Sequence, residues 1–184
     1  MPTPARLPRI TRTLNLALAI GLAANGVAQA HVHEHGAVKL DVAVEPGRIS
    51  VQMESPLDNL IGFEHAPRTD AERKKVEAMV ARLKAADGLF KIDPAAGCTV
   101  AAVELVSAPL KLGKPEPGAV EDGHADLDGD FTFNCKDSTR AAFIELGLFT
   151  AFSGMQRLDV QIAAPKGQAK QTLKRPATRL DLPR

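Results

Sequence analysis

The sequence predicts an α+β protein, mostly an antiparallel β-sheet with one main covering helix at about 70–86. Segments that alternate apolar and polar residues lie on both sides of a single segment with helical spacing. The two cysteines of the chain, Cys98 and Cys135, fall at the ends of two predicted strands and would staple them together.

The first two strands are predicted to form a hairpin. Residues 37–44 and 48–54 both alternate, and Glu45-Pro46-Gly47 between them is a turn signal. Pro56 ends the second strand. The side chains expected to face inward are Val42, Val44, Ile49, Val51 and Met53.

The main helix has a clear start and stop. Thr69 and Glu72 form a capping box, in which Thr69 is the N-cap. Asp87-Gly88 ends the helix. Its apolar face consists of Val76, Met79, Val80 and Leu83, which is the pattern of core packing.

Strands are predicted again beyond the helix. Residues 98–106 form a buried strand in this interpretation. The remaining segments are an alternating strand that ends at Cys135, a strand over 142–148 that leads into a helical turn at 149–152, an alternating strand over 157–163, and a polar strand or tail over 168–182.

Residues 1–30 have the three parts of a cleavable secretory signal. Three arginines precede an apolar run over 14–24, which is too short to span a bilayer. The small-x-small pattern at 28–30 then marks the cleavage site. We therefore expect export to the periplasm, cleavage near Ala30, and a single mature domain over 31–184.

The composition excludes some classes of partner. The chain holds 23 basic and 22 acidic residues, and removal of residues 1–30 leaves it slightly acidic. Nucleic-acid binding calls for a strong basic excess, so we expect none. No later segment is long and apolar enough for stable membrane insertion.

The cysteine pair has two interpretations. In an exported chain an even pair usually closes a disulfide, so we predict a bond between Cys98 and Cys135. The alternative is two free buried thiols. A metal site on these cysteines is disfavoured because they are far apart and form no Cys-x-x-Cys motif.

Histidines gather at the predicted mature N-terminus. His31, His33 and His35 are three of the five histidines in the chain. If this segment continues the strand that begins at Ala37, all three side chains share one face, with neighbouring histidines roughly 6.5–7 Å apart. Two of them can then meet one ion. Imidazole nitrogen suits Zn²⁺, and we predict a zinc site here. The alternative is a frayed terminus with no ligand role.

Copper is a second metal candidate. Cleavage after Ala30 would expose the amine of His31. That amine, the next two amide nitrogens and the His33 ring form a square-planar set that suits Cu²⁺ better than zinc.

Further candidate ligands are dispersed along the chain. His124 lies among acidic residues and is expected to be the fourth ligand, although a solvated turn explains it as well. Asp126 and Glu34 are additional carboxylate candidates. His65 is a further candidate, but a loop histidine that fixes the entry of the helix is the favoured interpretation.

No motif indicates catalysis. Neither His-Glu-x-x-His nor Gly-x-Ser-x-Gly occurs. A chain terminus is also a poor place for a rigid hydrolytic zinc pocket, so we predict that the protein is not an enzyme.

Several segments of the chain match the pattern of one known family. The most specific is the block over residues 54–69, Glu-Ser-Pro-Leu-Asp-Asn-Leu-Ile-Gly-Phe-Glu-His-Ala-Pro-Arg-Thr. Supporting segments are the histidine-rich start that ends in His35-Gly36, Ala96-Gly97-Cys98, Gly123-His124-Ala125-Asp126 before the strand that ends in Cys135, and the stretch from Leu148-Phe149 to Phe152. Together these residues resemble the ZrgA-like periplasmic proteins.

The resemblance implies a periplasmic zinc-binding protein that is made under zinc limitation and is associated with zinc uptake. Such proteins carry a histidine-rich loop before the segment that matches residues 124–126. The corresponding loop here, 114–123, contains no histidine. The N-terminal histidines and His124 would then carry the site.

Two functions of different classes follow. The first is capture of Zn²⁺ and its transfer to an envelope importer or receptor. The second is a non-metal interaction module that docks on an envelope transporter, which the histidine-free loop favours. An exposed apolar patch and indifference to metal ions would distinguish the second function.

Overall fold

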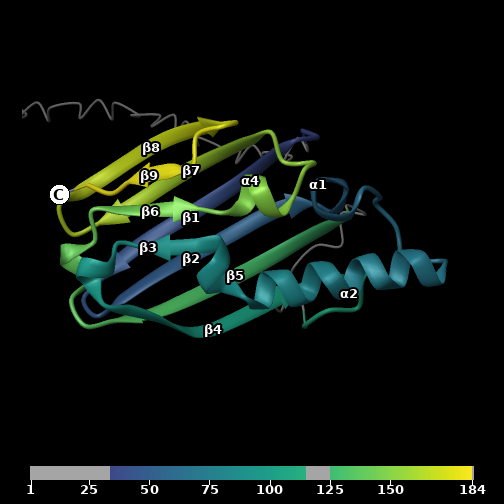
Figure 1. Cartoon of the computed structure of the whole chain (residues 1–184), viewed down its shortest axis with the longest axis horizontal. Coiled ribbons are helices and arrows are strands. Elements are labelled where there is room, and N and C mark those ends of the chain that lie inside the picture. Colours follow the sequence, from purple (N-terminus) through teal and green to yellow (C-terminus); the bar gives the residue numbers. More distant parts are fainter. Residues whose placement is uncertain (1–33, 115–124, 184) are drawn as a thin grey trace, which may run out of the picture. The chain divides into compact units, whose positions relative to one another are not determined.

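A six-stranded β-sheet is the largest element of the fold (Figure 1). The computed structural model describes residues 34–114 and 125–183. Along the sheet the strands follow the order β4-β5-β2-β1-β7-β8. Neighbours run antiparallel except β1 and β7, which pair in parallel. The strands are β1 (Ala37–Glu45), β2 (Arg48–Pro56), β4 (Cys98–Val106), β5 (Asp126–Cys135), β7 (Arg157–Ala164) and β8 (Gly167–Lys174).

A second, three-stranded sheet has the order β3-β6-β9. Its strands are β3 (Phe90–Ile92), β6 (Phe143–Leu146) and β9 (Arg179–Asp181). The helices are α1 (Leu57–Ile61), α2 (Asp70–Lys84), α3 (Ala86–Leu89) and α4 (Leu148–Ala151), with short 3-10 turns at Pro94–Ala96 and Ser138–Arg140. All these elements belong to one compact unit, Val32–Arg184.

The small sheet packs on one face of the large sheet (Figure 1). The Phe90 ring lies with its centroid 4.8 Å from that of Phe131 and 6.3 Å from that of Phe133, both on β5. The core therefore lies between the two sheets and α2. The predicted α+β class is confirmed, but the covering layer is shared by α2 and a second sheet rather than formed by one helix alone.

The predicted hairpin of β1 and β2 is confirmed. Val44 lies opposite Ile49, and the turn between them uses Gly47 at φ +76°. All five side chains expected to face inward are buried. This follows from the period of two, since alternate residues of a strand point to the same face.

The capping box at the start of α2 is confirmed. The Thr69 hydroxyl accepts from the Glu72 N–H at 3.2 Å, and the Glu72 carboxylate accepts from the Thr69 N–H at 3.0 Å. The predicted end was too late, because α2 stops at Lys84 and a separate turn, α3, follows. Met79 and Leu83 are buried, whereas Val76 and Val80 are only partly so.

The prediction that 98–106 is a buried strand is wrong. This segment forms β4 at the edge of the large sheet, and Val100 on it is 37% exposed. An apolar run does not distinguish an edge strand from a central one, because the number of neighbours is set by topology. The predicted disulfide is present, since Cys98 pairs with Cys135 across β4 and β5.

The other face of the large sheet is polar, as alternation in its strands requires. Within the described ranges, no helix is both long and apolar enough to cross a membrane.

Candidate metal site

A tight turn precedes β1. The Ala37 N–H donates to the Glu34 carbonyl oxygen at 2.9 Å, and Gly36 has φ +84°. This combination is typical of a type II β-turn, which favours glycine at its third position. The expectation that His35 continues β1 is therefore wrong, because Gly36 turns the chain immediately before the strand. His31 and His33 lie outside the described residues.

The turn brings His35 between two carboxylates. Its Nδ1 atom lies 3.2 Å from Asp58 Oδ2, and its Nε2 atom lies 3.5 Å from Glu64 Oε1. Asp58 comes from α1, and Glu64 from the segment between α1 and α2. Sequence reasoning did not single out either acid as a ligand, although both belong to the block over 54–69 that carries the family resemblance.

These distances fit a histidine–carboxylate metal site. In a tetrahedral zinc site with bonds of about 2.1 Å, two ligand atoms lie roughly 3.4 Å apart. The 3.5 Å between His35 Nε2 and Glu64 Oε1 matches that separation. A histidine ligand usually also directs its other ring nitrogen at a carboxylate, which is the position of Asp58.

The described residues supply only part of such a site. Across 34–114 and 125–183, no group of three or more histidine, cysteine or acidic side chains is arranged to hold an ion. His35 and Glu64 would contribute two ligands. The remaining ligands would have to come from positions such as His31, His33 and His124, which the structure does not describe.

The backbone of the turn is held on both sides. Asn59 on α1 accepts from the Gly36 N–H at 2.6 Å and donates to the Ala37 carbonyl oxygen at 2.8 Å. The Gly36 carbonyl oxygen accepts from the N–H groups of Gln156 and Arg157 at 2.7 and 2.9 Å. His35 is therefore attached to a fixed backbone even though its own side chain is 66% exposed.

Glu34 is engaged elsewhere. Both of its carboxylate oxygens accept from the Arg157 guanidinium, at 2.9 and 2.7 Å. This bidentate hydrogen bond lowers the pKa of Glu34 below its ordinary value of 4.5. Arg157 is fixed in turn by Asp159 at 2.8 Å. A ligand role for Glu34 would require the loss of this ion pair.

His65 is held by local contacts. Its Nδ1 atom lies 2.9 Å from the Ala66 carbonyl oxygen, and its ring stacks on Phe63 with the centroids 4.8 Å apart. A proton on Nδ1 would satisfy that carbonyl and leave the Nε2 lone pair available to a metal. The arrangement is that expected for a loop histidine that leads into α2, and it leaves a ligand role open.

The segment that follows His124 lies against α1. The Ala125 carbonyl oxygen accepts from the Leu57 N–H at 2.8 Å, and Asp126 lies opposite Pro56 in the pairing of β5 with β2. Both contacts are at the end of α1 that also carries Asp58. His124 itself lies outside the described residues.

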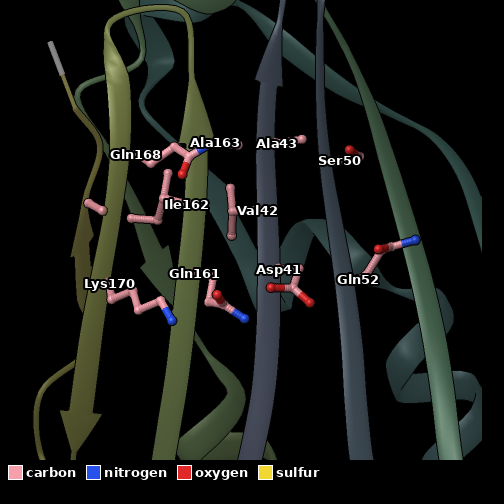
Figure 2. A pocket seen from close by; sticks show the side chains of 11 residues that line it. Asp41, Val42, Ala43, Ser50, Gln52, Gln161, Ile162, Ala163, Gln168 and Lys170 are labelled. Atoms are coloured by element: carbon pink, nitrogen blue, oxygen red, sulfur yellow. The ribbon is translucent and has the colours of Figure 1, made fainter. Parts of the chain in front are cut away.

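A hollow of about 410 Å³ lies on the polar face of the large sheet. Figure 2 shows the side chains that line it. Asp41, Gln52 and Gln161 project beside it from three adjacent strands. Among the residues that the structure describes, none of the predicted ligands lines this hollow.

Comparison with known proteins identifies the family of the chain. No curated protein matches the chain. The model of the ZrgA family zinc uptake proteins matches residues 32–182, a span that includes His35, Asp58 and Glu64. The chain therefore belongs to the ZrgA family of zinc uptake proteins.

Proposed function

We propose that this protein captures Zn²⁺ in the periplasm and passes it to an envelope importer or receptor. In this proposal residues 1–30 are removed during export, residues 31–184 form one zinc-binding domain, and the domain performs no catalysis. The observation that supports it most is the position of the His35 ring between Asp58 and Glu64.

Zinc would be bound by the His35 Nε2 atom and the Glu64 carboxylate. His31, His33 and His124 are proposed to complete the ligand set, with His65 and Asp126 as further candidates. Asp58 would orient the His35 ring through Nδ1 and would add negative charge near the ion. The disulfide between Cys98 and Cys135 stabilises the fold independently of metal.

The exposure of the site fits a transported ion rather than a structural one. His35 is 66% exposed, and Asp58 and Glu64 are each more than a third exposed. A structural zinc site is closed by four protein ligands, whereas a site that must release its ion needs access for solvent or for a receiving protein. The exposed carboxylate and imidazole meet that need.

Zinc titration by calorimetry tests the proposal. The protein would be purified from the periplasmic fraction of an expression host, and mass spectrometry would define its N-terminus. We expect micromolar or tighter binding, which His35→Ala and Glu64→Gln weaken by about ten-fold or more. The variant in which His31, His33 and His35 are all alanine should lose binding while remaining folded.

Glu77→Gln is the matched control, because Glu77 is an exposed carboxylate on α2. It should bind zinc as the wild type does. Absence of zinc binding by the wild type, or equal binding by His35→Ala, would refute the proposal. The non-metal interaction module would then be the function to test.

Copper through the free N-terminal amine is distinguished in the same preparation. Cu²⁺ bound there would absorb visible light, and an extra residue before His31 would disrupt this nitrogen set and change the absorption spectrum. Zinc binding through His35 and Glu64 does not depend on that amine.

A further inference from the structure

Asn59 is a buried polar residue with an unusual set of partners. It is 2% exposed and lies in the middle of α1. Its side chain binds no residue of its own helix. Instead, Oδ1 accepts from the Gly36 N–H at 2.6 Å and Nδ2 donates to the Ala37 carbonyl oxygen at 2.8 Å. A single amide thus fixes the two residues that follow His35.

The backbone of Asn59 packs closely against Gly154. A Cβ atom at Gly154 would lie 2.6 Å from the Asn59 carbonyl oxygen and 2.9 Å from its Cα atom, so only glycine fits there. The backbone N–H groups of Gln156, in the same loop, and of Arg157, the first residue of β7, donate to the Gly36 carbonyl oxygen. Residues 153–157 therefore contact both Asn59 and the turn that contains Gly36.

Asp58 and Asn59 are consecutive residues of α1. Asp58 contacts the His35 ring, whereas Asn59 binds the backbone directly after His35. The turn over residues 34–37, here called the histidine turn, is therefore bound to α1 in two ways. The His35 side chain contacts Asp58, and the backbone after His35 is hydrogen-bonded to Asn59. A displacement of the turn relative to α1 would separate the ring from Asp58 on α1 and would change its distance from Glu64, which lies three residues beyond the end of α1.

We propose that Asn59 is a positioning residue for zinc binding, which holds His35 at the separation from Glu64 that an ion requires. The inference rests on the proposed function. Residues near a chain terminus are often disordered unless other contacts hold them. Without the two hydrogen bonds of Asn59, His35 would have to become ordered when zinc binds. The free-energy cost of that ordering would lower the zinc affinity.

Ser138 provides a matched control, because its buried side chain also makes two hydrogen bonds to backbone groups. It is 1% exposed, accepts from the Gly47 N–H at 3.2 Å and donates to the Glu45 carbonyl oxygen at 2.6 Å. Ser138 therefore binds the opposite end of β1 in the same manner as Asn59 binds its beginning. Removal of either side chain leaves two backbone groups without their partner.

The experiment compares Asn59→Ala with Ser138→Ala in the full periplasmic protein. Thermal unfolding gives the Tm of each variant, and competition with a chromophoric chelator gives the Kd for zinc at a temperature where both are folded. We expect both variants to lower the Tm. Only Asn59→Ala should raise the Kd, by about ten-fold, while Ser138→Ala should remain within about two-fold of the wild type.

A second variant keeps the test decisive if Asn59→Ala does not fold. Asn59→Leu is close in shape, adds no charge, and removes both the acceptor for the Gly36 N–H and the donor to the Ala37 carbonyl oxygen. Weaker zinc binding by Asn59→Leu supports the inference, and equal or tighter binding by the folded variants overturns it. Amide exchange in the metal-free protein gives a readout without zinc, since the Gly36 N–H should exchange faster in the Asn59 variants only.

The two levels of failure are distinguishable. If the wild type binds no zinc, the proposed function fails and the inference fails with it. If the wild type binds zinc and His35→Ala weakens it, but Asn59→Ala binds as tightly as Ser138→Ala, the inference alone is wrong.

Discussion

Replacement of Asp58 by asparagine isolates its charge. The Asp58 oxygen lies 3.2 Å from His35 Nδ1. The imidazole ring separates its nitrogens by about 2.2 Å, and a zinc ion bound to Nε2 would lie about 2.1 Å beyond it, so the Asp58 carboxylate would be roughly 7 Å from the ion. Asparagine keeps the shape and one acceptor, so Asp58→Asn removes little besides the negative charge.

The size of the effect follows from Coulomb's law. At about 7 Å, charges of +2 and −1 attract by roughly 1 kcal/mol in a water-like dielectric and by roughly 2 kcal/mol at half that dielectric constant. Asp58 is 38% exposed, so the lower figure is the nearer one. We expect Asp58→Asn to raise the zinc Kd by roughly 5- to 30-fold, nearer the lower end of this range, with little change in the Tm.

The assay is chelator competition at physiological ionic strength, with Asp41→Asn as the control. Asp41 is exposed on β1, five residues beyond Gly36, and an extended strand therefore places it about 16 Å away. This distance exceeds the Debye length of about 8 Å, so its charge is screened from the ion. Equal Kd values for Asp58→Asn and Asp41→Asn would refute the assignment of Asp58.

Three further predictions concern the elements that support the site. Thr69→Ala removes the N-cap of α2 and should lower the free energy of unfolding by about 1 kcal/mol in urea; an unchanged midpoint would contradict this. Arg157→Gln should return the lowered pKa of Glu34 to about its ordinary value in an NMR titration. Because that pKa is lowered in the folded state, the part of the stability difference between wild type and Arg157→Gln that comes from Glu34 should be present above the ordinary pKa. This part should be lost as the pH falls through the lowered pKa of the folded state. Gly154→Ala should lower the Tm, since its Cβ would meet backbone at 2.6 Å, whereas Gly88→Ala meets nothing within 4 Å and should not.

Local signals predicted much of the fold. The hairpin of β1 and β2 and the capping box of α2 depend on residues close together in the sequence, and both are confirmed. The pairing of Cys98 with Cys135 followed from there being only two cysteines. The parallel pairing of β1 with β7 was not predicted, because alternation shows that a segment is a strand but not which strand lies beside it.

The candidate site was predicted only in part, because local sequence does not show which distant residues come together. The spacing of the histidines can be read from the sequence. Asp58 and Glu64 face His35 only because the turn at Gly36 reverses the chain. A glycine directly after a histidine is a weak turn signal on its own. The structure explains this glycine, because its N–H donates to the buried Asn59 side chain and so holds the turn in place.

The parallel pairing of β1 and β7 has a consequence for synthesis. The histidine turn leaves the ribosome early, but Glu34 and its partner Arg157 are 123 residues apart. β1 cannot pair with β7 until β7 has been synthesised. The Gly36 carbonyl oxygen likewise has no hydrogen bonds from Gln156 and Arg157 until residues 153–157 have been synthesised. A nascent or truncated chain would therefore carry His35 without the contacts that hold its turn. In the proposed function, zinc capture would then depend on completion of the polypeptide.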